Sequence, residues 1–451
     1  MKLWDKGFKI EKIIEDFTVG NDRQLDLLLA KYDVLGSIAH ARMLQSINIL
    51  TSDELEKLEE ELLVIYKKID SGKFKIAPNV EDVHSQVEIM LTDKLGEIGK
   101  KIHSGRSRND QVLLDIKLYL REEIHQIVNL CDDLFKKLMI LSQKYKNAIM
   151  PGYTHFQVAM PSSFGLWFGA YAETLIDDLM LLQAAFRVAN HNPLGSAAGY
   201  GTSFPINRTM TTKLLGFEDL TYNVIAAQMS RGKTETTVAF ALSSVASTLS
   251  KFSMDICLYN SQNFDFVSFP KEMTTGSSIM PHKQNPDVFE LIRAKCNRIK
   301  ALSNELQMST SNLPSGYHRD FQITKDILFP SIGELKNCLN ILTYMLAHIK
   351  VNTNIINDDK YKLVFSVEEV NKEVLKGTPF RDAYKKVGEA IANGSFEPDK
   401  EIHHTHEGSI NNLCNEEIAH KFTNVLKSFD FNKYQKALQL LVPESKLKPV
   451  I

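Results

Sequence analysis

Apolar residues recur at steps of three and four along exceptionally long stretches of this 451-residue chain. One stripe holds for about seven helical turns; its members are Val112, Ile116, Leu120, Ile124, Ile127, Cys131, Leu134, Leu138 and Leu141. Similar patterns cover 161–188, the stretch from about 233 to 256, 287–308 and 323–349. Ordinary helices average about 11 to 12 residues, so five helices of about 25 to 35 residues are unusual. Stripes this long bury against other helices, which predicts a central bundle and an oligomer.

Shorter helical patterns stand on both sides of the long stripes. Residues 1 to about 35 are irregular, a helical period opens at Gly36, and residues 51–54 offer a capping box for a second helix. Pro161 stands where a proline opens a helix. Beyond the stripes the patterns shorten to 364–375, 379–392, 411–427 and 431–440. We find no long β alternation, and we expect a mainly α protein with three helical domains: 1–105, the central long-helix bundle 106–350 that assembles into a tetrameric core, and 351–451.

Composition narrows the class of function. A formal charge of -2 leaves no overall basic field for nucleic acid or an anionic membrane surface. No apolar run approaches the roughly 18 residues that span a bilayer, and the N-terminus shows no export signal. The five cysteines lack any Cys-x-x-Cys pair, which argues against disulfides and thiolate metal sites and favours a reducing cytoplasm.

Cofactor motifs are also missing from the sequence. It contains no Walker loop and no G-x-G-x-x-G fingerprint. The histidine cluster at residues 403–406 lies in a polar stretch, which favours a surface loop over a metal site. We therefore expect chemistry on a small-molecule substrate, with no metal and no cofactor.

A loop at residues 276–286 carries reactive groups between two long helical patterns. Its Gly-Ser-Ser start permits unusual backbone angles, while two prolines stiffen the rest. A hydroxyl (Ser277), a cation (Lys283) and an amide (Asn285) lie within it, and Glu290 follows at the start of the next helix. Most such loops are plain connections, but this one is longer than a turnaround between helices requires. Glu290 fits either a first-turn acid or a carboxylate that orients a histidine.

Three other polar segments lie at predicted helix ends. Residues 104–110 precede the longest helix, so they fit either a receptor for an anion or an ordinary cap with solvated arginines. Residues 151–157 contain Thr154, His155 and Gln157, which suit the lip of a polar pocket, although a lone histidine is more often structural. Residues 317–325 mix donors and acceptors, as a binding segment or a solvated turn does.

Together these segments resemble the argininosuccinate lyases of the fumarase/aspartase superfamily. Residues 103–112 are similar to that family's His-Thr-Gly-Arg-Ser-Arg-Asn-Asp-Gln-Val run, and residues 33–44 match its N-terminal block. Further matches are 151–157, 192–196 and 317–325. The 276–286 loop is a superfamily signature, although its Pro-His-Lys is closer to adenylosuccinate lyases.

The resemblance implies a mainly α homotetramer in which three subunits assemble each active site. It also implies reversible β-elimination of argininosuccinate to arginine and fumarate. Ser277 then takes the position of the catalytic base, and His155, paired with Glu290, takes the position of the catalytic acid. Lys283 and Asn285 match residues that bind a substrate carboxylate. The other residues on substrate-contacting positions are Ser107, Arg108, Asn109, Thr154, Tyr317, Gln322 and Lys325.

Three segments depart from the family pattern. Residues 230–233 read Ser-Arg-Gly-Lys instead of Ser-Asp-Arg-Asp, residues 22–26 keep only the final aspartate of Ser-x-Ser-Phe-Asp, and Gln284 replaces a lysine. Two alternatives remain: another fumarate-releasing lyase, such as one for adenylosuccinate, and a crystallin-like structural protein on the same scaffold. The 104–111 and 153–157 runs disfavour the first, and the intact reactive residues disfavour the second.

Overall fold

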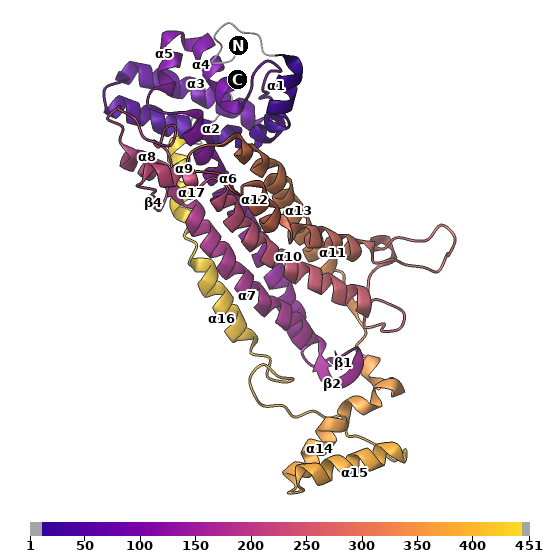
Figure 1. Ribbon diagram of the computed structural model, residues 1–451. Helices are drawn as coiled ribbons and strands as arrows, with labels where there is room; N and C mark the ends of the chain where they lie inside the picture. The colour runs from indigo at the N-terminus through magenta and orange to yellow at the C-terminus, as the bar shows by residue number, and fades with distance from the viewer. Residues whose placement is uncertain (1–10, 444–451) are drawn as a thin grey trace.

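The computed structural model describes residues 11–443 and is mainly α, as predicted. A small helical cap sits at one end of a long bundle (Figure 1). The cap helices are α1 (Lys12–Val19), α2 (Asp22–Ser46), α3 (Ser52–Asp70), α4 (Val83–Leu95) and α5 (Glu97–Lys100). The predicted capping box at α3 is confirmed: the Thr51 hydroxyl accepts from the Glu54 N–H, and the Glu54 carboxylate accepts from the Thr51 N–H.

Helix α2 begins at Asp22 and runs through Gly36, so the prediction that a helix opens at Gly36 is wrong. A Cβ atom at Gly36 would lie 2.6 Å from the Leu114 side chain. The glycine therefore serves the close packing of α2 on the next long helix, and the sequence pattern registers this contact rather than a helix start.

The bundle is built on four long helices that pack side by side (Figure 1). They are α6 (Arg108–Lys144), α7 (Phe164–Ala189), α10 (Lys233–Tyr259) and α13 (Ile323–Leu346), and they confirm four of the five predicted long helices. The fifth pattern is divided into α11 (Asp287–Ile299) and α12 (Leu302–Ser309). The division falls where the Ala301 N–H bonds to Arg298 three residues back, so the α-helical pattern of bonds four residues apart stops there.

A β-hairpin precedes α7 at the end of the bundle farthest from the cap (Figure 1). Strands β1 (Ile149–Thr154) and β2 (Gln157–Ser163) pair antiparallel, and Pro161 lies inside β2. The prediction that Pro161 opens the helix is therefore wrong. The Ser163 hydroxyl caps α7 by accepting from the Leu166 N–H at 3.0 Å, so the helix starts where its first free N–H groups find a side-chain acceptor.

The remaining elements are short connections between the long helices. Helices α8 (Arg208–Leu214) and α9 (Val224–Met229) lie between α7 and α10. Two-residue strands also pair β3 (His191–Asn192) with β4 (Asp219–Leu220), and β5 (Val267–Ser268) with β6 (Lys350–Val351).

The C-terminal part divides between the two ends of the molecule. Helices α14 (Ser366–Leu375) and α15 (Phe380–Ala392) lie beyond the hairpin and share a small core of their own (Figure 1). Helix α16 (Asn415–Lys427) returns along α7, and α17 (Phe431–Leu441) packs on α2 and α8. The division at 105/106 and 350/351 into three domains stays a proposal, with α16 and α17 joined to the main core.

One continuous apolar core joins the cap, the bundle and the returning helices. Within residues 11–443, no helix has both the length and the apolar character that crossing a membrane requires. The core fixes where the polar helix ends lie, and these ends carry the candidate site.

Candidate functional site

A polar cavity of about 250 Å³ lies where the cap meets the first turns of α6 and α13. Five predicted substrate contacts come together there: Arg108, Asn109, Tyr317, Gln322 and Lys325. The other lining residues are Asp22, Asp26, Glu81, Asp82, His84, Val112 and Arg319. The lining of this cavity therefore carries both signs of charge.

Lys325 forms the floor of this cavity. Its ammonium group lies 2.6 Å from Asp26 and 2.7 Å from Asp22, and the residue is 4% exposed. Burial alone would lower the pKa of Lys325, but the charges of Asp26 and Asp22 outweigh it and raise that pKa. Burial raises the pKa of Asp22 to about 6 against the opposing effect of Lys325. Two carboxylates thus hold one buried cation in place.

A second group of ion pairs closes the rim. Arg108 lies 2.8 Å from Asp82 and 3.1 Å from Glu81, and Arg319 lies 3.0 Å from Glu81. Burial works against ionisation of Asp82, but the charges of His84 and Arg108 lower its pKa to about 2. Asp82 also caps α4, where it accepts from the Ser85 N–H at 2.8 Å. The start of α4 and the start of α6 are therefore tied to each other.

The polar side chains at the start of α6 have two different roles. Some cap the helix, and others line the cavity. Ser107 is the N-cap, and its hydroxyl accepts from the Asn109 N–H at 3.3 Å. Asp110 accepts from the Ser107 N–H and from the N–H groups of Gly195 and Ala197, so it anchors the 193–201 segment. Ser107 therefore has a capping role in this chain, while the Asn109 side chain lines the cavity.

The 317–325 segment is fastened to the cap. Gln322 donates to the backbone oxygens of Thr18 and Val19 at 3.0 and 3.1 Å, and Arg319 donates to Thr18 at 2.8 Å. These bonds hold α1 beside the start of α13. The segment thus presents Lys325 from a fixed backbone.

The departure at residues 230–233 has a structural explanation. Arg231 is 3% exposed, pairs with Glu235 at 2.8 Å and donates to the Phe321 carbonyl oxygen at 2.7 Å. Glu235 in turn accepts from the Gly232 N–H at 2.8 Å and caps α10. Arg231 therefore points inward and supports the backbone of the 317–325 segment.

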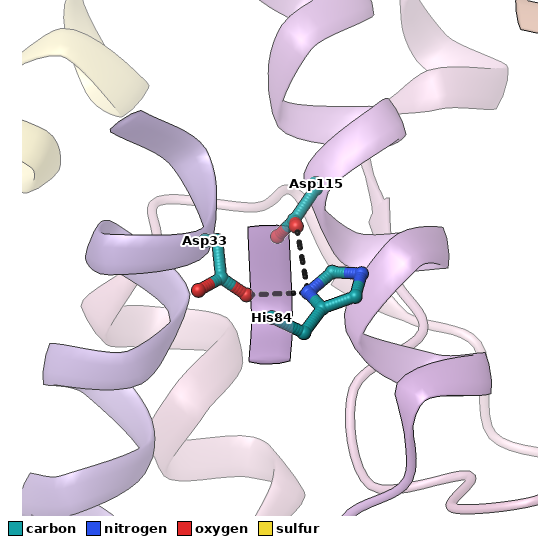
Figure 2. Close-up of side chains that lie close together, drawn as sticks. All are labelled: Asp33, His84 and Asp115. Carbon is teal, nitrogen blue, oxygen red and sulfur yellow. Dashed lines mark hydrogen bonds and ion pairs between the residues drawn. The ribbon is translucent and has the colours of Figure 1, made fainter. Parts of the chain in front are cut away.

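His84 of the cavity lining belongs to a buried cluster with Asp33 and Asp115, and the three residues come from α4, α2 and α6 (Figure 2). The His84 Nδ1 lies 2.7 Å from an Asp33 oxygen and 3.6 Å from an Asp115 oxygen. Burial alone would lower the pKa of His84, but the Asp33 and Asp115 charges raise it to about 9. Burial and the Asp33 charge raise the pKa of Asp115 well above its usual value, so Asp33 is the main counter-charge.

The same three side chains have spacing that suits a cation, since their ligand atoms lie within 4.8 Å of one another. At neutral pH a proton on His84 already neutralises this cluster, and a metal ion would have to displace it. The half-buried Arg106 adds a second positive charge that acts on Asp33 and Asp115. A proton on His84 and the charge of Arg106 would both compete with a cation at this cluster.

The proposed catalytic loop lies apart from the cavity and projects from the bundle between α10 and α11 (Figure 1). Its base is closed by an antiparallel bridge between Thr275 and Asn285. The Ser277 hydroxyl accepts from the N–H groups of Ile279 at 3.4 Å and Met280 at 3.2 Å. Lys283 is exposed, and no ion pair of its side chain is found within residues 11–443. The loop is therefore formed but open to its surroundings.

The other proposed catalytic groups are also exposed. His155 and Phe156 form the two-residue turn between β1 and β2, with φ of 53° and 58°. Turns of this kind favour Asn-Gly, so two bulky residues with positive φ store strain at the tip of the hairpin. Thr154 is exposed beside them, and Glu290 is exposed in the first turn of α11. No bond joins His155 to Glu290 in the part of the chain described.

Distance separates the two halves of the proposed site. Helix α6 has 37 residues, with Asn109 in its first turn and the hairpin after its last. At about 1.5 Å per residue, this helix spans about 55 Å. The cavity contains none of the proposed groups from the loop or hairpin. Within one chain, the hairpin and the cavity therefore lie at opposite ends of α6.

Sequence reasoning missed Glu81, Asp82 and His84, which line the cavity. The signal was present in the run 81–84, where two acids and a histidine precede the apolar face of α4. An isolated polar run before a helix resembles an ordinary cap, so only its proximity to Arg108 and Asp33 reveals the role.

Comparison with known proteins agrees with this arrangement. A family model described as lyase matches residues 7–301. An argininosuccinate lyase of Bacteroides thetaiotaomicron is 60% identical over 98% of this chain and 99% of its own length. Among solved structures, an EDDS lyase variant with bound fumarate has a TM-score of 0.78 at 20% identity, covering 98% of this chain and 96% of its own. A class II fumarase of Schistosoma mansoni has a TM-score of 0.71 at 17% identity, with 95% of both chains covered.

The two structural neighbours confirm the expected mainly α superfamily fold. The near full-length sequence match confirms the resemblance drawn from the short motifs. The chain belongs to the lyase family and, within it, to the argininosuccinate lyases.

Proposed function

We propose that this chain is a carbon-nitrogen lyase that splits argininosuccinate reversibly into arginine and fumarate, a step of arginine biosynthesis. The observation that carries this function is 60% identity to an argininosuccinate lyase over nearly the full length of both chains. The mixed charge of the cavity suits such a substrate, which carries carboxylates and cationic nitrogen groups together.

In the proposed mechanism, Ser277 removes the proton from the carbon beside a substrate carboxylate. A serine hydroxyl is a weak base, so its alkoxide form needs stabilisation. The Ile279 and Met280 N–H groups already point at its oxygen, and Lys283 from the same loop adds a positive charge on closure. Lys283 and Asn285 also receive the carboxylate on which negative charge accumulates.

The departing guanidino nitrogen requires a proton at the same time. We assign this step to His155, oriented by Glu290, because imidazole transfers protons near neutral pH. Thr154, beside it on the hairpin, and the cavity residues Asn109, Tyr317, Gln322 and Lys325 hold the substrate. Arg108 and Ser107 complete this binding side by fixing the start of α6.

The assembly we propose is a homotetramer in which three chains share each active site. The separation of about 55 Å along α6 supports sharing, because the hairpin and the cavity of one chain lie at opposite ends. Exposed apolar side chains on the bundle helices supply a contact surface; they include Met180, Leu181, Phe240, Met254, Leu291 and Tyr344. Five free cysteines fit a cytoplasmic location.

Release of fumarate tests the function directly. Ultraviolet absorbance is followed with argininosuccinate and with adenylosuccinate offered separately. Fumarate from argininosuccinate alone supports the proposal, and turnover of adenylosuccinate alone contradicts it. Light scattering at micromolar concentration tests the assembly, since a monomer that retains full activity excludes shared sites.

A further inference from the structure

His84 lines the cavity and is held by two carboxylates that do not line it. It lies in the first turn of α4, is 6% exposed and lines the cavity together with Arg108 and Lys325. Both of its carboxylate partners, Asp33 and Asp115, approach the same ring nitrogen, Nδ1 (Figure 2). The ring therefore cannot rotate without losing the buried hydrogen bond to Asp33.

The other ring nitrogen remains available. Figure 2 shows Nε2 on the side of the ring away from both carboxylates, and Nε2 makes no hydrogen bond within residues 11–443. The other three cations of the cavity have their counter-ions within its lining. Arg108, Arg319 and Lys325 are each ion-paired with carboxylates that line the same cavity. Among the cations of the described lining, His84 thus differs in that its carboxylate partners, Asp33 and Asp115, lie outside that lining and leave its Nε2 pointing away from them.

We propose that His84 is a further substrate-binding residue, whose Nε2–H donates to a carboxylate of the bound substrate while Asp33 fixes its Nδ1. This inference rests on the proposed function and assigns one more contact to the same site. A charged donor held in one orientation binds a carboxylate more strongly than a mobile neutral one. Because the residue contacts ground state and transition state alike, it contributes to KM more than to kcat.

The surroundings of His84 keep this donor charged over the working pH range. Asp33 acts on it from α2, Asp115 from α6 and Asp82 from the N-cap of its own helix, while Asp26 acts on Asp115. Arg106, Arg108 and Lys325 supply the nearby positive charges. The carboxylates prevail, so substrate affinity should not weaken between about pH 6 and 8.

The test compares two amide variants in the full-length protein. His84→Asn keeps a polar atom near the Nδ1 position and removes the outward donor, whereas His84→Gln keeps an amide near Nε2. We expect the KM for argininosuccinate to rise about 10- to 100-fold in His84→Asn, with a smaller rise in His84→Gln and kcat within about threefold of the parent in both. An unchanged KM, or an equal loss of kcat in both variants, overturns the assignment.

A second variant covers the case in which His84→Asn does not fold. Asp33→Asn keeps the imidazole but removes its main counter-charge, so KM should rise with pH between about 6 and 8, in contrast to the parent. A KM that is equally flat in parent and variant overturns the role of His84. Parent protein that releases no fumarate would instead overturn the proposed function, and the inference with it.

Discussion

Two regions of the molecule are built in opposite ways. One is the cavity between the cap and the bundle, and the other is the loop at residues 276–286. In the cavity, Lys325 is buried between Asp22 and Asp26, and the rim arginines are ion-paired. In the loop, Lys283 is exposed, and Ser277 is held only by two backbone N–H groups of its own turn. The charged groups of the cavity are held in place by partners in the same chain, whereas the polar groups of the loop are exposed and make few contacts with the rest of the chain.

This difference teaches where stability and activity reside. Removing a cavity charge leaves its buried partners without compensation, so stability and binding fall together. Removing a loop group touches no buried contact, so activity falls alone. The following variants separate the two regions, from the largest expected effect to the smallest.

Ser277→Ala should lower kcat by about 10³-fold, because the general base is lost while substrate binding remains. Its free energy of unfolding should stay within about 0.5 kcal/mol of the parent, since the side chain is only partly buried. Fumarate release and urea unfolding provide the measurements. Ser278→Ala is the matched control on the adjacent exposed residue and should leave kcat unchanged. Near-normal kcat in Ser277→Ala removes this serine as the base.

Lys325→Met should lower the free energy of unfolding by about 3 to 5 kcal/mol, because Asp22 and Asp26 lose their buried counter-ion. Lys283→Met, the same substitution in the loop, should lower activity without any comparable loss of stability. Urea unfolding of both variants measures the contrast. Equal stability losses would contradict the division between a preorganised cavity and an open loop.

Arg231→Met should lower the free energy of unfolding by about 3 kcal/mol, since Glu235 is left buried without its partner. Its KM should also rise, because the backbone that carries Gln322 and Lys325 loses the bond from Arg231 to Phe321. Lys233→Met, on an exposed neighbour, is the control and should change neither quantity. An unchanged KM in Arg231→Met would show that the segment holds its position without this arginine.

Asp22→Asn should alter the pH dependence of stability. In the folded chain the pKa of Asp22 is raised to about 6 from 3.8, so the folded state binds more protons than the unfolded state between these values. The free energy of unfolding therefore falls as pH rises from about 4 to about 6. In Asp22→Asn the free energy of unfolding should fall less over this pH range than in the parent, by a difference on the order of 1 kcal/mol. Urea unfolding at several pH values measures this difference. Identical pH curves for parent and variant would contradict burial as the main influence on Asp22.

Much of the fold could be predicted from the sequence because helical periodicity is local. The stripe from Val112 to Leu141 predicted α6, and the capping box at Thr51 marked the start of α3. Predictions failed where a residue served a distant contact instead of its own segment. Gly36 fits against Leu114 of another helix, and Pro161 pairs with a strand that precedes it.

The candidate site divides in the same manner. Motifs identified Arg108, Asn109 and the 317–325 segment, and the structure brings these into one cavity. Motifs did not identify His84, because its role depends on two aspartates that are distant in the sequence. Asp33 lies 51 positions before it and Asp115 lies 31 positions after it. The roles of Ser277, His155, Lys283 and Glu290 stay proposals that the variants above address.

By itself, the sequence determined the helical class, the family and the types of reactive group, since each follows from spacing and residue identity along a short stretch. Only the tertiary structure decided that Lys325 lies between two carboxylates, that Arg231 faces inward and that His84 presents one nitrogen to the cavity. The physical reason is that charge interactions depend on distance and burial in three dimensions, and a linear sequence specifies neither until the apolar stripes have packed.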